Sequence, residues 1–166
     1  ATATFYRNII PYLKNYKYDS VTRITFGGEK YDIELEKAIK SIFPKGEIRN
    51  IYASTEAGSL FMAQGEAFYI PIAIRDYIKF NKNAELLIHK NLIGSSSSLI
   101  LEGEWYNTGD LVEIIDENHF IFKTRASDLI NVGGYKVNPL EVESVLQKVS
   151  GVIDVVVKAK DNKVTD

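Results

Sequence analysis

The stretch Trp105–Lys136 reads WYNTGDLVEIIDENHFIFKTRASDLINVGGYK and decides the fold of this chain. Its centre contains two apolar runs, residues 111–115 and 119–122, which are separated by the turn-forming residues 116–118. Runs of β-branched and aromatic residues bounded by Asp, Asn and Gly are typical of β-hairpins. We therefore predict that these two runs pair as the strands of a hairpin.

Two polar clusters, residues 106–110 and 124–128, flank this hairpin at the outer ends of its strands. Pairing of the strands is expected to bring Asp110 close to Arg125. A carboxylate beside a guanidinium can bind a polyol and a phosphate at the same time. The alternative is a surface hairpin with a solvated salt bridge, which would contribute little to stability.

The composition indicates a folded chain of modest size. Its 166 residues suffice for one domain or for parts of two, and 45% hydrophobic residues support a packed core. A formal net charge of -2 argues against nucleic-acid binding driven by charge. The chain has no cysteine, which excludes disulfides and thiolate sites. It shows neither a basic-then-apolar leader nor an apolar run near the ~18 residues of a membrane span. We expect a soluble, cytoplasmic protein.

The N-terminal part alternates between strand and helix patterns. A short strand is expected over Val21–Phe26, an amphipathic helix over Ile33–Phe43 with Asp32 as its N-cap, and a second strand over Ile48–Tyr52. Strand, helix and strand with short connections form a βαβ unit, so the two strands should be parallel. Residues 4–17 have helical spacing, in which Pro11 breaks or starts a helix.

The loops after those two strands, residues 27–29 and 54–56, should therefore emerge at the same edge of the sheet. In open α/β sheets the carboxyl edge of the strands is where ligands bind. Paired glycines such as Gly27 and Gly28 let a backbone approach a flat ligand, although most such pairs are simply turns.

The later part of the chain has a different pattern, with short strands followed by a helix. Short strands of an antiparallel unit are expected at Phe68–Ile70, Tyr77–Phe80, Glu85–Ile88 and Ser98–Leu101. A helix should begin after Asn138, with Pro139 at its first position, and stop at Gly151. Its apolar stripe would consist of Val142, Val145, Leu146 and Val149. A final strand is expected over Val152–Val157, before the polar tail.

Residues 105–111 (WYNTGDL) and 124–143 (TRASDLINVGGYKVNPLEVE) resemble the signature motifs of the adenylate-forming superfamily. This family comprises acyl-CoA synthetases, adenylation domains of peptide synthetases and luciferases. The matching positions are Tyr106, Thr108, Gly109, Asp110, Arg125, Asp128, Asn131, Gly134, Lys136, Glu141 and Glu143. Residues 51–58 (IYASTEAG) resemble the family's adenine motif, with Ala53 where glycine is more usual. Motifs in this order and at this spacing are a more specific signal than one glycine pattern.

The resemblance implies a site for an adenylate. Gly27, Gly28 and Tyr52 would sandwich the adenine ring, to which a tyrosine offers a π face. Asp110 would hold the ribose hydroxyls, and Arg125 would contact ribose or phosphate. The other nucleotide-binding residues that the resemblance implies are Glu29, Ala53, Ser54, Gly134 and Lys136.

Thr55 and Glu56 are the catalytic residues that the resemblance implies. The Thr55 hydroxyl would donate to a phosphate oxygen, and the Glu56 carboxylate would bind Mg²⁺, which prefers oxygen ligands. Without the other motifs, Tyr52 would be read as a core aromatic residue and Glu56 as a solvated charge.

The resemblance also implies an α/β fold in several parts. These are the end of a large parallel α/β subdomain (1–65), a β-barrel-like antiparallel subdomain (66–123), a hinge (124–128) and the start of a small βα lid domain (129–166). The hinge residue is either Ser127 or Asp128. Gly133 and Gly134 would pass close to the thiol arm of the acceptor.

The implied function is that of an AMP-forming carboxylate ligase resembling acyl-CoA synthetases. It would join a carboxylic acid to AMP with ATP and Mg²⁺, and then transfer the acyl group to a thiol, for which coenzyme A is the expected carrier. One alternative is an adenylation enzyme that loads a carrier protein. Another is an adenine-nucleotide-binding module without catalysis.

Two features of the family find no match in this sequence, namely the phosphate loop upstream of the adenine motif and the lysine near the end of the lid. Residues 94–98 (GSSSS) follow the adenine motif instead of preceding it, so they are read as a polar loop. We therefore expect a fragment truncated at both ends that is inactive by itself. His89 and His119 are isolated from any nucleophile or ligand cluster and are expected to be structural.

Overall fold

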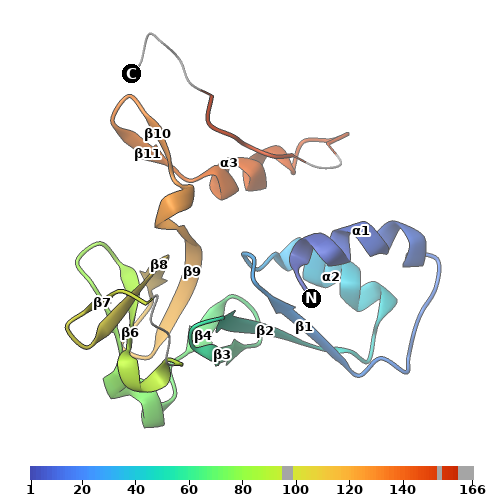
Figure 1. Ribbon diagram of the computed structural model, residues 1–166. Coiled ribbons are helices and arrows are strands. Elements are labelled where there is room, and N and C mark those ends of the chain that lie inside the picture. The colour runs from blue at the N-terminus through green and yellow to red at the C-terminus, as the bar shows by residue number, and fades with distance from the viewer. Residues whose placement is uncertain (95–98, 153–154, 161–166) are drawn as a thin grey trace.

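The computed structural model describes residues 1–94, 99–152 and 155–160. An N-terminal α/β unit, an antiparallel β unit and a C-terminal hairpin with one helix follow one another along the chain (Figure 1). The elements of the N-terminal unit are α1 (Ala3–Leu13), β1 (Arg23–Gly27), α2 (Ile33–Ile42), β2 (Glu47–Ser54) and β3 (Gly58–Ala63).

The predicted βαβ unit is present. Strands β1 and β2 are parallel, with Ile24 opposite Ile48 and Gly27 opposite Ile51. Strand β3 pairs antiparallel with β2 and completes a sheet in the order β1-β2-β3. A Cβ on Gly27 would lie 3.1 Å from the Ile51 carbonyl oxygen, so glycine permits this close pairing. The loops after β1 and β2 therefore leave the same edge of the sheet, as predicted.

Helix α2 begins where the sequence predicts. The Asp32 side chain accepts hydrogen bonds from the backbone amides of Glu34 and Leu35, at 2.9 and 3.1 Å. Leu35 and Ile39 belong to the buried face of the helix. This face packs into a core that includes residues of α1, β1 and β2. Capping and a continuous apolar stripe together account for the helix.

Helix α1 continues through Pro11 and ends at Leu13. Because proline has no amide hydrogen, the helix lacks the bond from position 11 to the Arg7 carbonyl, and it ends two residues later. At the other end, Thr2 accepts a hydrogen bond from the Phe5 amide at 3.2 Å. Arg7 of α1 forms an ion pair with Asp32 at 2.8 Å, which joins the two helices.

We expect Asp32→Ala to lower the free energy of unfolding by about 1–2 kcal/mol, because it removes both the cap and the partner of Arg7. Asp32→Asn keeps an oxygen that can cap and should cost less. Burial alone would raise the pKa of Asp32, but hydrogen bonds from Arg7 and from backbone amides outweigh it and lower the pKa. The charge therefore stabilises the fold above the unfolded-state pKa, and this stabilisation is lost as the pH falls through the folded-state pKa.

Urea unfolding at neutral and acidic pH measures both effects. Equal losses of unfolding free energy in Asp32→Ala and Asp32→Asn at neutral pH would contradict a capping role. A stability difference between the unmodified chain and Asp32→Asn that persists in strong acid would contradict the role of the charge.

The antiparallel unit is a six-stranded sheet in which β4, β9, β8, β6 and β5 are neighbours in that order and β7 pairs with β8. Its strands are β4 (Ala67–Tyr69), β5 (Ile78–Phe80), β6 (Glu85–His89), β7 (Leu101–Glu102), β8 (Trp105–Ile114) and β9 (His119–Arg125). Short 3-10 helices η1 (Ile72–Tyr77) and η2 (Lys90–Leu92) connect some of them.

The hairpin predicted from Trp105–Lys136 is formed by β8 and β9, and it places Asp110 directly opposite Arg125. Strand β8 extends through the polar cluster 106–110, whereas β9 ends at Arg125, within the cluster 124–128. Strand β7 is shorter than the predicted Ser98–Leu101. Ser98 and the rest of the predicted polar loop at 95–98 lie outside the described residues.

The centre of this unit is aromatic. Phe120 is fully buried, and its ring lies 5.1 Å from Phe61, 5.5 Å from Phe68 and 5.6 Å from Phe80. Tyr52 of β2 also belongs to this core. Strand β2 therefore joins the N-terminal unit to the antiparallel unit.

The C-terminal part contains η3 (Ala126–Asp128), β10 (Ile130–Val132), β11 (Tyr135–Val137) and α3 (Pro139–Leu146). Asn138 caps α3 by accepting a hydrogen bond from the Leu140 amide at 3.0 Å, as predicted. The helix ends at Leu146, so the predicted end at Gly151 is wrong.

The predicted final strand is also wrong, since Val152 and Val155–Val157 are not in a strand. Val145, Val149 and Val156 are 64%, 54% and 65% exposed. The Val157 amide donates instead to the Glu143 side chain, at 2.7 Å. Residues 161–166 of the polar tail lie outside the described residues. Of the helices described, none is long and apolar enough to cross a membrane.

Candidate functional site

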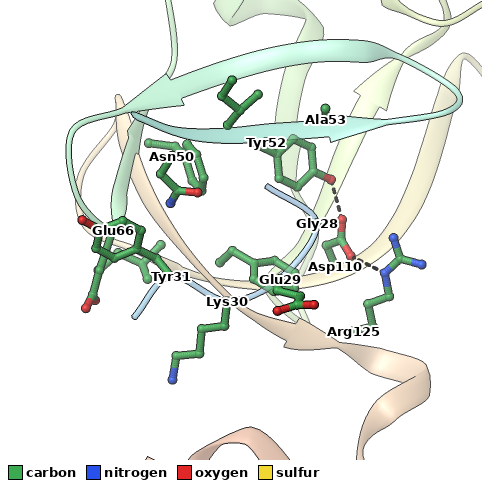
Figure 2. Close-up of a pocket in the computed structure, with 14 residues that line it drawn as sticks. Gly28, Glu29, Lys30, Tyr31, Asn50, Tyr52, Ala53, Glu66, Asp110 and Arg125 are labelled. Carbon is green, nitrogen blue, oxygen red and sulfur yellow. Dashed lines mark hydrogen bonds and ion pairs between the residues drawn. The ribbon is translucent and has the colours of Figure 1, made fainter. Parts of the chain in front are cut away.

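A pocket of about 580 Å³, including space open to solvent, lies between the loop after β1, strand β2 and the β8–β9 hairpin (Figure 2). Its lining combines charged, polar and aromatic side chains from segments far apart in the sequence. The lining residues are Gly28, Glu29, Lys30, Tyr31, Asn50, Ile51, Tyr52, Ala53, Glu66, Phe68, Asp110, Ile121, Phe122 and Arg125.

Asp110 is the buried charge of this pocket, with 4% of its surface exposed. The Tyr52 hydroxyl donates a hydrogen bond to Asp110 Oδ2 at 2.5 Å. Arg125 Nε lies 3.2 Å from Asp110 Oδ1 as an ion pair, yet Oδ1 has no hydrogen-bond partner among the described residues. Buried polar atoms normally have such a partner. The free oxygen can therefore accept a hydrogen bond from a ligand.

Burial raises the pKa of Asp110, and the Tyr52 hydrogen bond and the Arg125 charge oppose this rise. Burial and the neighbouring Asp110 charge raise the pKa of Tyr52 strongly. Tyr52 therefore keeps its proton and remains a donor. Arg125, whose side chain is 62% exposed, places a solvated cation at the mouth of the pocket.

The glycine loop forms another wall of the pocket. Gly28 has a φ of 78°, a left-handed conformation that favours glycine. The Glu29 carboxylate accepts hydrogen bonds from the Thr4 amide at 2.8 Å and the Thr4 hydroxyl at 3.0 Å. Helix α1 thus holds the loop that carries Gly28 and Glu29. Gly27 does not line the pocket; it lies in β1, close to β2.

Tyr52 has a different environment from the one that the adenine motif implies. Its ring is 8% exposed and lies 5.5 Å from Phe61, 6.0 Å from Phe68 and 6.4 Å from Phe120. Its hydroxyl end points at Asp110 (Figure 2). Stacking of the ring on adenine stays a prediction.

Ser54, Thr55 and Glu56 lie away from this pocket. The Ser54 hydroxyl accepts a hydrogen bond from the Ala57 amide at 3.1 Å, and Thr55 is exposed. Glu56 lines a second hollow together with Tyr106 and other residues. Its own backbone amide, followed by nearby hydroxyls, lowers the pKa of Glu56, which keeps the side chain ionised.

A metal cage made by the protein alone is not present, because the described residues contain no group of three His, Cys, Asp or Glu side chains that could hold an ion. Mg²⁺ is commonly held by one or two carboxylates together with substrate phosphates. An ionised, partly exposed Glu56 fits that mode of binding.

The remaining predicted residues lie in the C-terminal part. Gly134 and Lys136 belong to the β10–β11 hairpin, are exposed and do not line the pocket. Ser127 and Asp128 lie in η3, where the Ser127 hydroxyl donates a hydrogen bond to Asp128 at 3.1 Å. The choice between them as hinge residue stays open.

Several lining residues were not predicted. Asn50 is 3% exposed and donates a hydrogen bond to the Gly65 carbonyl at 3.1 Å. It lies two residues before Tyr52 on the same face of β2, which is the signal that could have identified it. Lys30 and Tyr31 directly follow the glycine loop. Phe122 lies on β9, and an apolar residue in a strand gives no sign in the sequence that it lines a pocket.

Comparison with known proteins identifies relatives of this chain. No family model matches the chain. Luciferin 4-monooxygenase of Photinus pyralis is 26% identical over 164 residues, which cover 83% of this chain and 30% of the luciferase. The long-chain-fatty-acid–CoA ligase FadD13 of Mycobacterium tuberculosis is 47% identical over 53 residues, 32% of this chain and 10% of the ligase.

Solved structures show the same fold. E. coli MenE with bound OSB-AMS has a TM-score of 0.73 at 19% identity, over 98% of this chain and 37% of MenE. The chain is therefore similar in sequence and in fold to adenylate-forming enzymes. MenE of Bacillus subtilis, solved in complex with ATP and magnesium ion, has a TM-score of 0.68 at 19% identity, over 98% of this chain and 38% of that enzyme.

The resemblance predicted from the motifs is confirmed, because the relatives that the chain matches are enzymes of this kind. The chain spans about a third of the length of the relatives that it matches along most of its own length. Its two signature segments supply Asp110 and Arg125, which the hairpin register places opposite each other.

Proposed function

We propose that this chain is the adenylate-holding part of an AMP-forming carboxylate ligase resembling acyl-CoA synthetases. The observation that carries the proposal is the buried carboxylate of Asp110, a residue of the pocket lining whose Oδ1 has no hydrogen-bond partner among the described residues. A carboxylate oxygen in this state accepts hydrogen bonds from a ribose diol. Each hydrogen bond to a charged group contributes about 1.5–3 kcal/mol.

The other walls suit the rest of an adenylate. Arg125 offers a guanidinium beside Asp110, where it can contact a ribose or phosphate oxygen. Phe68, Phe122 and Gly28 offer apolar and backbone surface for a flat base. The similarity of the chain to the luciferase, FadD13 and MenE supports an adenylate site, since the family joins carboxylic acids to AMP.

Glu56 is the residue that we propose to hold Mg²⁺. The metal would neutralise charge on the phosphates of ATP when it is bound. Thr55, next to Glu56 and exposed, would donate its hydroxyl to a phosphate oxygen. The B. subtilis MenE complex with ATP and magnesium ion supports the choice of metal.

Coenzyme A is the acceptor that we propose, because FadD13 is a CoA ligase by name. The exposed β10–β11 hairpin, which carries Gly134 and Lys136, would lie beside the thiol arm. Residues 1–65 and 66–123 would be two subdomains, 124–128 the hinge and 129–166 the start of a lid.

Two assays test the proposal. AMP binding to the chain is measured by titration calorimetry, and ATP–pyrophosphate exchange is measured on the full-length protein with a panel of carboxylic acids. Exchange that depends on one class of acid, together with AMP binding, is the expected result. AMP binding without exchange for any acid would favour a nucleotide-binding module. Absence of AMP binding would contradict the proposed site itself.

A further inference from the structure

The Tyr52 hydroxyl lies on the carboxylate on which the proposed function depends. It donates its hydrogen bond to Asp110 Oδ2 at 2.5 Å, and both residues are more than nine-tenths buried. Tyr52 comes from β2 and Asp110 from β8, so only the folded chain brings them together. A phenol has a single proton to donate, and this one is committed to Asp110.

The two oxygens of Asp110 consequently differ. Oδ2 is occupied by Tyr52, whereas Oδ1 faces Arg125 without a hydrogen bond. A free carboxylate could rotate and exchange its oxygens, but one oxygen held by a fixed donor cannot. Oδ1 is thereby left without a hydrogen bond, beside Arg125 in the wall of the pocket.

The donor is fixed because the Tyr52 ring is packed into the aromatic core. Phe61 and Phe68 lie 5.5 and 6.0 Å from it, and the Phe120 ring meets it edge-on at 6.4 Å. Such close-packed rings do not shift to follow a moving partner. The hydroxyl therefore determines where the carboxylate lies, and not the reverse.

We propose that Tyr52 is a positioning residue, whose hydroxyl fixes Asp110 so that Oδ1 is aimed at the diol of the bound nucleotide. The inference rests on the proposed function, because it assigns the ligand of Oδ1 to the adenylate. It differs from the sequence expectation, in which the face of the Tyr52 ring contacts adenine.

The charges around Asp110 come from several elements. Arg125 of β9 favours the ionised form, whereas Asp128 of η3 opposes it. Tyr106, also on β8, is a neutral phenol that interacts with Asp110. The remaining ionisable side chains that line the pocket are Glu29, Lys30, Tyr31 and Glu66. Loss of the Tyr52 hydroxyl removes a donor that favours the ionised form, so the pKa of Asp110 should rise further.

The test compares Tyr52→Phe with the unmodified chain. AMP affinity, measured by calorimetry at neutral pH, should fall about tenfold or more, as expected for a lost hydrogen bond to a charged group. The acid limb of the affinity–pH profile should move to higher pH. Tyr6→Phe is the matched control, because it removes a hydroxyl that donates to the Thr25 carbonyl in the other core. Its acid limb should coincide with that of the unmodified chain.

A ring that only stacks on adenine would give the opposite result. Phenylalanine keeps the ring, so unchanged affinity and an unchanged acid limb in Tyr52→Phe would overturn the proposal. If Tyr52→Phe only destabilised the fold, AMP affinity would fall but the acid limb would stay where it is. That result would also overturn the proposal.

Direct titration of the Asp110 carboxyl by ¹³C NMR in the free chain separates this inference from the proposed function. A higher Asp110 pKa in Tyr52→Phe is expected whether or not AMP binds. If the unmodified chain binds no AMP, the proposed function fails, and the assignment of Oδ1 to an adenylate fails with it. An unchanged Asp110 pKa would overturn the positioning role alone.

Discussion

Asp110→Asn is expected to abolish most AMP binding while the chain stays folded. The substitution keeps the shape of the side chain but replaces the charged acceptor by a neutral amide. Two charged hydrogen bonds to a ribose diol contribute enough that affinity should fall about a hundredfold. Calorimetric titration with AMP measures the loss.

The same substitution should not lower the melting temperature at neutral pH. Burial raises the pKa of Asp110. The folded chain therefore binds this proton more tightly than the unfolded chain, and ionisation above the folded-state pKa costs stability. A neutral Asn avoids that cost, and Arg125 stays solvated because its side chain is 62% exposed. Sites adapted for binding commonly carry such a cost.

Asp116→Asn is the matched control. Asp116 lies at the turn between β8 and β9, where it contacts His119 at 2.9 Å, and it does not line the pocket. Asp116→Asn removes the same charge from the same hairpin as Asp110→Asn does. Because Asp116 lies outside the pocket lining, AMP affinity should stay within about twofold. Equal losses of affinity in both variants would point to net charge instead of a specific contact.

Phe120→Ala should lower the free energy of unfolding by about 3–5 kcal/mol, the largest stability effect that we expect in this chain. Phe120 is fully buried, and four aromatic rings pack around it, namely Tyr52, Phe61, Phe68 and Phe80. Truncation leaves a cavity that these rings cannot fill without leaving their positions. Because whole domains are stable by only about 5–15 kcal/mol, this is a large share of the total.

Urea unfolding followed by circular dichroism measures this effect. Phe5→Ala is the control, since Phe5 is 50% exposed on α1 and its loss should cost about 0.5 kcal/mol or less. AMP affinity should also fall in Phe120→Ala, because Tyr52 loses a neighbour that fixes its ring. Similar stability losses in the two variants would show that Phe120 is not the centre of the core.

The hairpin and the βαβ unit could be predicted from the sequence because their signals are local. The turn at 116–118 makes the two apolar runs neighbouring strands, so the proximity of Asp110 and Arg125 could be predicted. The register shift between Leu111 and Val112, which sets Asp110 directly opposite Arg125, could not. Asp32 and the apolar stripe of α2 likewise lie within one short segment. Local agreement between capping, periodicity and turn chemistry makes such predictions reliable.

The environment of Tyr52 could not be predicted in the same way. Its hydroxyl meets Asp110 only because β2 crosses from one core into the other, a long-range packing result that no local pattern encodes. Asn50, by contrast, could have been found from its place two residues before Tyr52 on the same face of β2. The strand expected over Val152–Val157 is not found in the described part of that range, because β propensity depends strongly on tertiary context.

The most direct test of the adenylate site compares AMP with 2′,3′-dideoxy-AMP in calorimetric titrations of the chain. The two ligands share base, phosphate and charge, and they differ only in the diol that Asp110 Oδ1 would hold. We expect AMP to bind at least about tenfold more tightly. Equal affinities would contradict the assignment of Asp110 to the ribose, and binding of neither ligand would contradict the adenylate site as a whole.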